Sequence, residues 1–264
     1  MSGDSPPSWR RPQWAHLAPL AALAALTAVW QSVPAWTGLD VTVLPPPSQV
    51  ISAGWADRTA IAEATGATLQ ITLLGLLLSV GLAVVLAGAL SFLRPLRQTM
   101  LPLLIGAQSV PVIVLAPLFI IWFGFGPEPK ILLVAVVSML PLTLATLQGL
   151  LSADDEAATL LRSMGASGWQ VFLRLRVFSA LPFFFTGLRI VASFVVVSAI
   201  FSEYVGAKTG LGIYMQLQKN LFRTDLVFAA VLVTIVIGLA LFATTYLLEA
   251  LTMPWERRRK AARR

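Results

Sequence analysis

The chain has 264 residues, of which 57% are hydrophobic and only 12% are charged, and its formal net charge is +7. A soluble domain of this length carries about twice that charged fraction, so the composition indicates one polytopic membrane domain. The absence of cysteine excludes disulfides, thiolate metal sites and cysteine nucleophiles. Nucleic-acid binding is not expected, because the basic residues gather in the C-terminal tail and beside apolar runs, as topology signals and lipid contacts do.

Residues 1–16 are polar and are expected to form a tail, with the lone histidine, His16, as an interfacial residue rather than a ligand. A first apolar run at 17–33 is predicted to be a retained membrane helix rather than a signal peptide, and residues 17–64 comprise this helix and an external segment. The run Pro45-Pro46-Pro47 excludes a helix at that point.

Five more apolar runs follow, at 67–93, 101–123, 131–151, 183–202 and 226–251. Each is long enough to span a bilayer as a helix, so we predict an all-α fold with six transmembrane helices. An even number of spans puts both termini on one side, which carries fourteen basic residues against five on the other. The positive-inside rule therefore predicts cytoplasmic termini, a cytoplasmic loop at 152–182 and a basic cytoplasmic tail at 253–264.

Motifs for catalysis are absent from the sequence. Residues Gly206 to Gly210 have the residue types of a phosphate-binding loop but not its spacing, and they fall on the external side. The adjacent acids Asp154, Asp155 and Glu156 point in different directions on a helix and are expected to mark a helix N-terminus rather than a metal site. An intramembrane enzyme is therefore not expected, and neither a bound metal nor a bound cofactor is predicted.

The charged segment 154–189 is the best indicator of function, because two spanning helices need only a short turn between them. Ser152 and the acids after it predict a helix start, and Gly165 predicts its left-handed end. A second helix is expected at 169–177, with Pro182 marking entry into the fifth span. The two short helices and the glycine turn between them form a compact unit, here called the knob. The knob could fit a groove in a partner, or it could lie as an amphipathic hairpin on lipid headgroups.

This segment resembles the cytoplasmic "EAA" loop of permease subunits of bacterial ABC importers. Gly165-Ala166-Ser167 matches the glycine step of that loop, and Leu175 falls at its apolar position. The triplet Glu156-Ala157-Ala158 has six residues before Gly165, so the acidic position of the pattern falls on Thr159 instead. The first Leu-Pro is replaced by Val177-Phe178, while Leu181-Pro182 is present.

The resemblance continues through most of residues 40–255. Three segments resemble the nitrate, sulfonate and taurine branch: the third span from Val110-Pro111 to Trp122-Phe123-Gly124, the sequence Glu203-Tyr204-Val205-Gly206 with Gly210-Leu211-Gly212, and the proline-rich start at Leu44. Within that branch the sequence at 163–167 and 180–187 is most similar to that of permeases for thiamine pyrimidine precursors or riboflavin.

The resemblance implies a type I ABC importer permease fold, with the permease domain at 65–252, in the bacterial inner membrane. Expected partners are a cytoplasmic ATPase that uses the ATP, a second permease copy in a homodimer, a periplasmic or lipid-anchored solute-binding protein, and the bilayer. The cargo would be a small solute, nitrate-, sulfonate- or taurine-like, or pyrimidine- or riboflavin-like. The ATPase contact would involve Glu156, Ala157, Ala158, Thr159, Leu160, Leu161, Met164, Gly165, Ala166 and Ser167, with most weight on 160–167.

Polar residues inside the spans are the candidates for the translocation path, because polar groups are costly in hydrocarbon. Gln108, Ser109 and Pro111 interrupt the third run, either as a proline kink or as a path-lining site. Glu203 closes the fifth run and either bonds the glycine-rich turn after it or belongs to an outer gate. The alternative class is a secondary transporter or channel that needs no ATPase, for which intramembrane charge and an inverted repeat would be expected.

Overall fold

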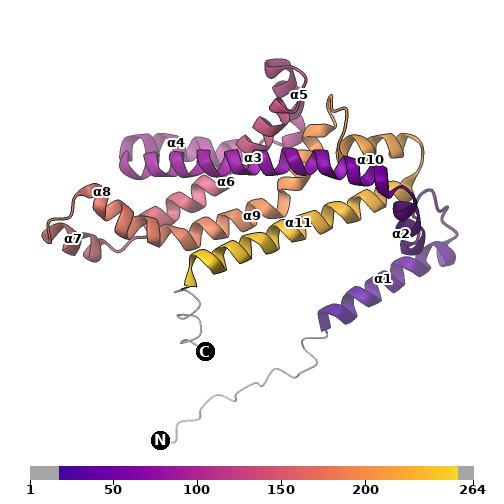
Figure 1. Cartoon of the computed structure of the whole chain (residues 1–264), viewed down its shortest axis with the longest axis horizontal. Coiled ribbons are helices and arrows are strands. Elements are labelled where there is room, and N and C mark those ends of the chain that lie inside the picture. The colour runs from indigo at the N-terminus through magenta and orange to yellow at the C-terminus, as the bar shows by residue number, and fades with distance from the viewer. Residues whose placement is uncertain (1–17, 255–264) are drawn as a thin grey trace, which may run out of the picture.

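The structure is a computed structural model that describes residues 18–254, and in this range it is built of helices without a strand (Figure 1). The elements are α1 Ala18–Thr37, α2 Pro47–Ala56, α3 Arg58–Phe92, α4 Arg94–Ala107, α5 Val112–Phe123, α6 Glu128–Leu151, α7 Asp155–Ser163, α8 Gly168–Val171, the π-helical η2 Phe172–Arg176, α9 Val177–Glu203, α10 Leu211–Asn220 and α11 Thr224–Thr252. The expected tail at 1–16 lies outside the described residues, and so does the expected tail at 253–264 from residue 255 onward.

Six spans are confirmed if a broken pair is counted as one. Five helices are long and apolar enough to cross a membrane, and α4 with α5 passes the same test together. The chain bends by 106° between the two halves of that pair, so the predicted third span is not one straight helix. The ends of the other helices differ from the ends of the predicted apolar runs, because a helix can continue beyond its apolar residues. For example, α3 begins at Arg58, whereas the apolar run predicted there begins at residue 67.

The proline run interrupts the helices only in part. Pro46 has an extended backbone, but Pro47 is the first residue of α2. Proline is tolerated at this position because the N–H it lacks has no helical partner there, and its fixed φ suits a helix start. The prediction that residues 45–47 all exclude a helix is therefore wrong for Pro47.

The core of the bundle is formed by α3, α6 and α9, which lie along one another (Figure 1). Glycines bring these helices into close contact: a methyl group on Gly149 of α6 would lie 2.7 Å from the Ala180 Cα of α9, and one on Gly75 of α3 would lie 2.6 Å from Val134 of α6. Small residues serve this purpose in membranes because lipid provides no hydrophobic force between helices, and close van der Waals packing must replace it.

Two groups of short elements lie at opposite ends of the bundle. Figure 1 shows α7 and α8 at one end and α2 with α10 at the other, while α1 lies apart from the core, next to α2. No residue of α1 is buried, and its contacts are made near its end, where Trp30 Nε1 donates to the Pro45 carbonyl at 3.2 Å. The fold thus separates the predicted coupling segment from the predicted external turns.

Candidate functional site

The N-cap of helix α7 is Asp154, not the serine predicted from the sequence. The Asp154 side chain accepts hydrogen bonds from the backbone N–H of Glu156 at 2.8 Å and of Ala157 at 3.4 Å. Ser152 instead ends α6, where its hydroxyl donates to the Gly149 carbonyl at 2.9 Å. An aspartate in extended conformation is a strong N-cap, and its charge also favours the positive end of the helix dipole.

The end of α7 is a left-handed glycine turn, as predicted. Gly165 has a φ of 87°, and its N–H donates to the Arg162 carbonyl at 2.9 Å, while the Ala166 N–H donates to the Leu161 carbonyl at 3.0 Å. This pair of bonds defines a Schellman motif, which satisfies the last carbonyls of a helix. A methyl group on Gly165 would meet no heavy atom within 4 Å, so the glycine is required by its backbone conformation and not by crowding.

The chain after this turn does not form the separate second helix that was predicted. Ser167 and Gln170 form a capping box that starts α8, and the helix then runs through η2 into α9 without a break. Pro182 lies inside α9 instead of at its start. Membrane helices tolerate proline because neighbouring groups satisfy the carbonyl that it leaves unpaired, and a π-helical turn like η2 often marks a functional site.

The ten predicted coupling residues lie together on α7 and its glycine turn. Leu160 and Met164 are 63% and 76% exposed, and their spacing of four places them on the same face of the helix. Ala158 faces inward and is buried. Glu156 and Thr159 are both exposed and are one turn apart, so the helix presents both candidates for the acidic position to solvent.

An aromatic stack joins this knob to the corner between α3 and α4. The ring centroid of Phe92 lies 6.2 Å from that of Trp169 and 4.8 Å from that of Phe172, and the Trp169 and Phe172 centroids are 5.2 Å apart. Offset aromatic pairs contribute about 0.5–1.5 kcal/mol each beyond their buried area. The sequence carries no signal for this stack, because Phe92 lies in a different helix and looks like any other apolar residue of its run.

A buried polar network closes the opposite end of α9. Glu203 is fully buried and accepts hydrogen bonds from the Thr68 hydroxyl and the Gly212 N–H, both at 2.7 Å. Thr68 in turn accepts from the Leu211 N–H at 2.8 Å. Of the two roles expected for Glu203, this geometry supports the bond to the glycine-rich turn, and it ties α3, α9 and the start of α10 together.

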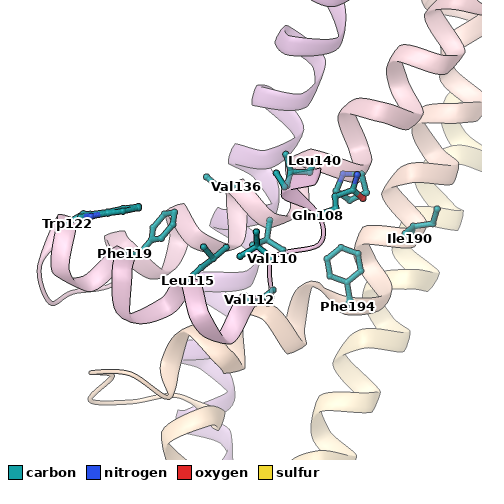
Figure 2. A pocket seen from close by; sticks show the side chains of 13 residues that line it. Gln108, Val110, Val112, Leu115, Phe119, Trp122, Val136, Leu140, Ile190 and Phe194 are labelled. Carbon is teal, nitrogen blue, oxygen red and sulfur yellow. The ribbon is translucent and has the colours of Figure 1, made fainter. Parts of the chain in front are cut away.

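The break between α4 and α5 opens a cavity of about 580 Å³. Its walls come from the break itself, from α5, from the middle of α6 and from Ile190 and Phe194 of α9 (Figure 2). Gln108 lines this cavity, whereas Ser109 and Pro111 are not among its lining residues. Glu203 lies nine residues beyond Phe194 on α9, roughly 13 Å along a helix, so the candidate path residues do not form one site.

A further ionic contact links α9 to α11. Arg189 donates to the Glu249 carboxylate and lies over the Tyr246 ring, with its guanidinium carbon 5.4 Å from the ring centroid. A charged side chain within a span requires such a partner. From the sequence we expect Arg189 to extend to the membrane surface and Glu249 to pair with the basic tail; in the structure the two side chains pair with each other, and the tail residues 255–264 lie outside the described residues. Among the described residues, no group of three or more histidine, cysteine, aspartate or glutamate side chains could hold a metal ion.

Comparison with known proteins decides the family. Residues 75–253 match the family described as binding-protein-dependent transport system inner membrane component. The chain belongs to this family. It is therefore a multi-pass inner-membrane permease subunit of an ATP-driven importer and not an enzyme, and its family works with an ATP-binding subunit and a solute-binding protein.

Relatives with established names cover most of the chain. It is 35% identical over 192 residues to the formylaminopyrimidine transport permease protein ThiX of Halalkalibacterium halodurans, covering 73% of this chain and 77% of that protein. It is 32% identical over 251 residues to the riboflavin transport system permease protein RibX of Chloroflexus aurantiacus, covering 94% of each. Identity to the taurine transport system permease protein TauC of Escherichia coli is 29% over 244 residues, covering 89% and 88%.

Solved structures confirm the predicted fold. An inward-facing form of the MetNI methionine ABC transporter matches with a TM-score of 0.58 at 21% identity, covering 70% of this chain and 92% of that chain. An amino acid ABC transporter matches with a TM-score of 0.59 at 17% identity, covering 78% and 97%. The chain therefore has the type I ABC importer permease fold.

Proposed function

We propose that α7 and its Gly165 turn dock into a cleft of the cytoplasmic ATPase and pass its motion to the spans. The observation that carries this proposal is the exposed apolar pair Leu160 and Met164 on a short helix capped firmly at both ends. A capped helix with a protruding apolar face can enter a groove as a preformed unit, which lowers the entropy lost on docking. The alternative, a hairpin lying on lipid headgroups, uses the same face.

The path of the motion follows the continuous helix from the knob to the outer turn. Residues 168–203 form one helical rod, with the aromatic stack at one end and the Glu203 network at the other. A displacement of the knob therefore moves α9, and through Phe92 it also moves the end of α3. ATP binding and hydrolysis belong to the partner, and this chain binds no cofactor of its own.

The surroundings of the chain follow from this role. We place both termini and the segment 152–182 in the cytoplasm, where the ATPase is, on the strength of the basic-residue count. A second copy of the chain completes the path, and a periplasmic or lipid-anchored solute-binding protein delivers the cargo to the end that carries α2 and α10. The names of the relatives support a small organic or anionic solute. They leave two classes of solute for experiment to distinguish, a heterocycle and a sulfonate.

Co-purification with the ATPase tests this function. Replacing Leu160 and Met164 by aspartate (L160D/M164D) is expected to abolish recovery of the ATPase with tagged permease and to abolish ATP-driven uptake. The control is Leu221→Asp, which removes an apolar residue of similar exposure at the opposite end of the bundle. Uptake that continues when the ATPase site is disabled would instead identify a secondary transporter or channel.

A further inference from the structure

The cavity at the break between α4 and α5, here called the slot, has a composition that selects among solutes. Its lining residues include no charged side chain, and Gln108 supplies the only amide. The other lining residues are aliphatic side chains, Pro141 among them, and the aromatic rings of Phe119, Trp122 and Phe194. At about 580 Å³ the slot has the volume of a site for a small organic molecule.

The polar and aromatic groups have a definite arrangement within the slot. Figure 2 shows Gln108 and Phe194 at one end, with Trp122 and Phe119 at the other and aliphatic side chains such as Leu115 between them. The Phe119 and Trp122 rings are 5.8 Å apart between centroids, so they form a single aromatic wall. A flat molecule at the Gln108 end of the slot meets the Phe194 ring and the Gln108 amide together.

A sulfonate or another anion finds little in the slot to replace its water. Transfer of an unpaired ion into a poorly solvated site costs several kcal/mol. The one feature that favours an anion is the N-terminus of α5, whose dipole contributes about 0.3–1 kcal/mol at an ordinary exposed site. Its cap residue, Pro111, provides no side-chain cap, so the first N–H groups of α5 are left free, but this gain is still smaller than the penalty of several kcal/mol.

An uncharged heterocycle matches the same groups. Aromatic faces stack on planar rings of any kind, and an amide offers both a donor and an acceptor to the edge of a ring that carries nitrogen or carbonyl groups. An acyl chain would fill the aliphatic middle but would leave the Gln108 amide without a partner, which is costly for a desolvated polar group. The chemistry of the lining therefore favours a planar nitrogen heterocycle over both an anion and a lipid tail.

We infer that the slot is a binding site for an uncharged planar nitrogen heterocycle on its way through the permease, with Gln108 reading the ring edge and Phe194 stacking on its face. The inference rests on the proposed function, because it assumes that this chain forms the solute path. It assigns the specificity of the path to the break between α4 and α5 and to α9. A solute with a bare sulfonate would then pass poorly, whatever the binding protein delivers.

Direct binding to the purified permease–ATPase complex in nanodiscs tests the inference without the solute-binding protein. The probes are radiolabelled riboflavin and a neutral aminopyrimidine, against propanesulfonate as the anion. Saturable binding of a heterocycle is expected, with none for propanesulfonate. Gln108→Leu and Phe194→Leu should each weaken heterocycle binding about 5- to 10-fold, as the loss of one hydrogen bond or one ring contact does.

Matched variants keep the result decisive. Phe201→Leu removes a phenylalanine from the same helix outside the slot lining and should leave binding unchanged. Gln108→Lys places a cation in the slot and should lower heterocycle binding while allowing propanesulfonate to bind. Each variant must still elute with the ATPase at the wild-type ratio, which shows that it is folded.

The outcomes separate the inference from the proposed function. Stronger binding of propanesulfonate than of either heterocycle by the unaltered complex overturns the inference, as does heterocycle binding that is absent or unaffected by both leucine substitutions. ATP-driven uptake and ATPase recovery, measured on the same preparations, report the proposed function independently. If the complex hydrolyses ATP and transports solute but fails the binding test, the proposed coupling function stands and only the inference about the slot is overturned.

Discussion

Gly165 offers the sharpest test of the coupling knob, because backbone conformation and side-chain bulk can be separated there. Its φ of 87° lies in the left-handed region, where a residue with a side chain costs about 1–2 kcal/mol more than glycine. Relieving that strain would require the turn to open and release the two Schellman hydrogen bonds. A shift of about 1–2 kcal/mol changes the ratio of formed to opened turn roughly 5- to 30-fold.

The expected result is a loss of coupling without a loss of protein. Gly165→Leu should lower ATP-driven uptake in proteoliposomes, by at most about 5- to 30-fold, while the amount of permease in the membrane stays constant, since no part of this chain lies within 4 Å of the new methyl position. Uptake should be divided by the amount of permease, measured by immunoblot, and the ATPase rate should be recorded in the same vesicles.

Two controls distinguish the physical causes. Asparagine tolerates the left-handed region better than leucine at nearly the same size, so Gly165→Asn should retain much more uptake if conformation decides. Gly168→Ala changes a glycine in the same knob that has open space and an ordinary φ, and it should be nearly silent. Wild-type uptake by Gly165→Leu would refute the reasoning. Equal losses of uptake in the leucine and asparagine variants would show that crowding of the side chain against the ATPase, and not backbone conformation, is the cause.

The remaining predictions concern the contacts that hold the knob and the bundle. Trp169→Leu should lower uptake per ATP hydrolysed while ATPase recovery stays normal, with partial rescue by Trp169→Phe; unchanged coupling would remove the aromatic stack from the path of motion. In Glu203→Gln an amide NH2 group replaces one carboxylate oxygen, so either the Gly212 N–H or the Thr68 hydroxyl loses its acceptor. We expect the free energy of unfolding in detergent to fall by about 1–3 kcal/mol. Gly149→Ala should destabilise by about 1–3 kcal/mol because its methyl group meets the α9 backbone, whereas a methyl group on Gly88 has open space, and equal unfolding temperatures for the two alanine variants would contradict this packing.

The outer end of the bundle depends on a contact that is expected to be insensitive to pH. The Tyr214 hydroxyl donates to the Asp57 carboxylate at 2.6 Å and ties α10 to the start of α3. Burial and then the bond to Asp57 raise the pKa of Tyr214, so the hydroxyl remains protonated through neutral and mildly alkaline conditions. Because the folded pKa is raised, this contribution to stability is complete below the ordinary tyrosine pKa and would be lost only at higher pH.

Local chemistry made several features predictable from the sequence. The Gly165 cap depends on residues within one turn of each other, and the acidic start of α7 depends on three consecutive side chains, so spacing alone indicates both. Errors occurred where two local signals competed. Ser152 and Asp154 were both candidates for the N-cap of α7, and in the structure the N-cap is Asp154. Pro182 suggested a helix start, yet a helix surrounded by other helices accommodates it.

Contacts between distant residues could not be predicted in the same way. Phe92 with Trp169, Thr68 with Glu203 and Arg189 with Glu249 each join different helices, and no spacing along the chain relates their members. The slot is the same kind of feature, because Gln108 and Phe194 become neighbours only when the third span breaks.

By itself, the sequence determined that the chain crosses the membrane as helices and where a knob would protrude from it. Apolar runs of bilayer length require helices, because every backbone group must find a partner inside its own segment in hydrocarbon. It did not determine which helices touch, since lipid tails are as apolar as the side chains and give one helix face no preference for protein over lipid. Only the tertiary structure decided that α3, α6 and α9 pack through glycines and that the third span bends by 106° to open the slot.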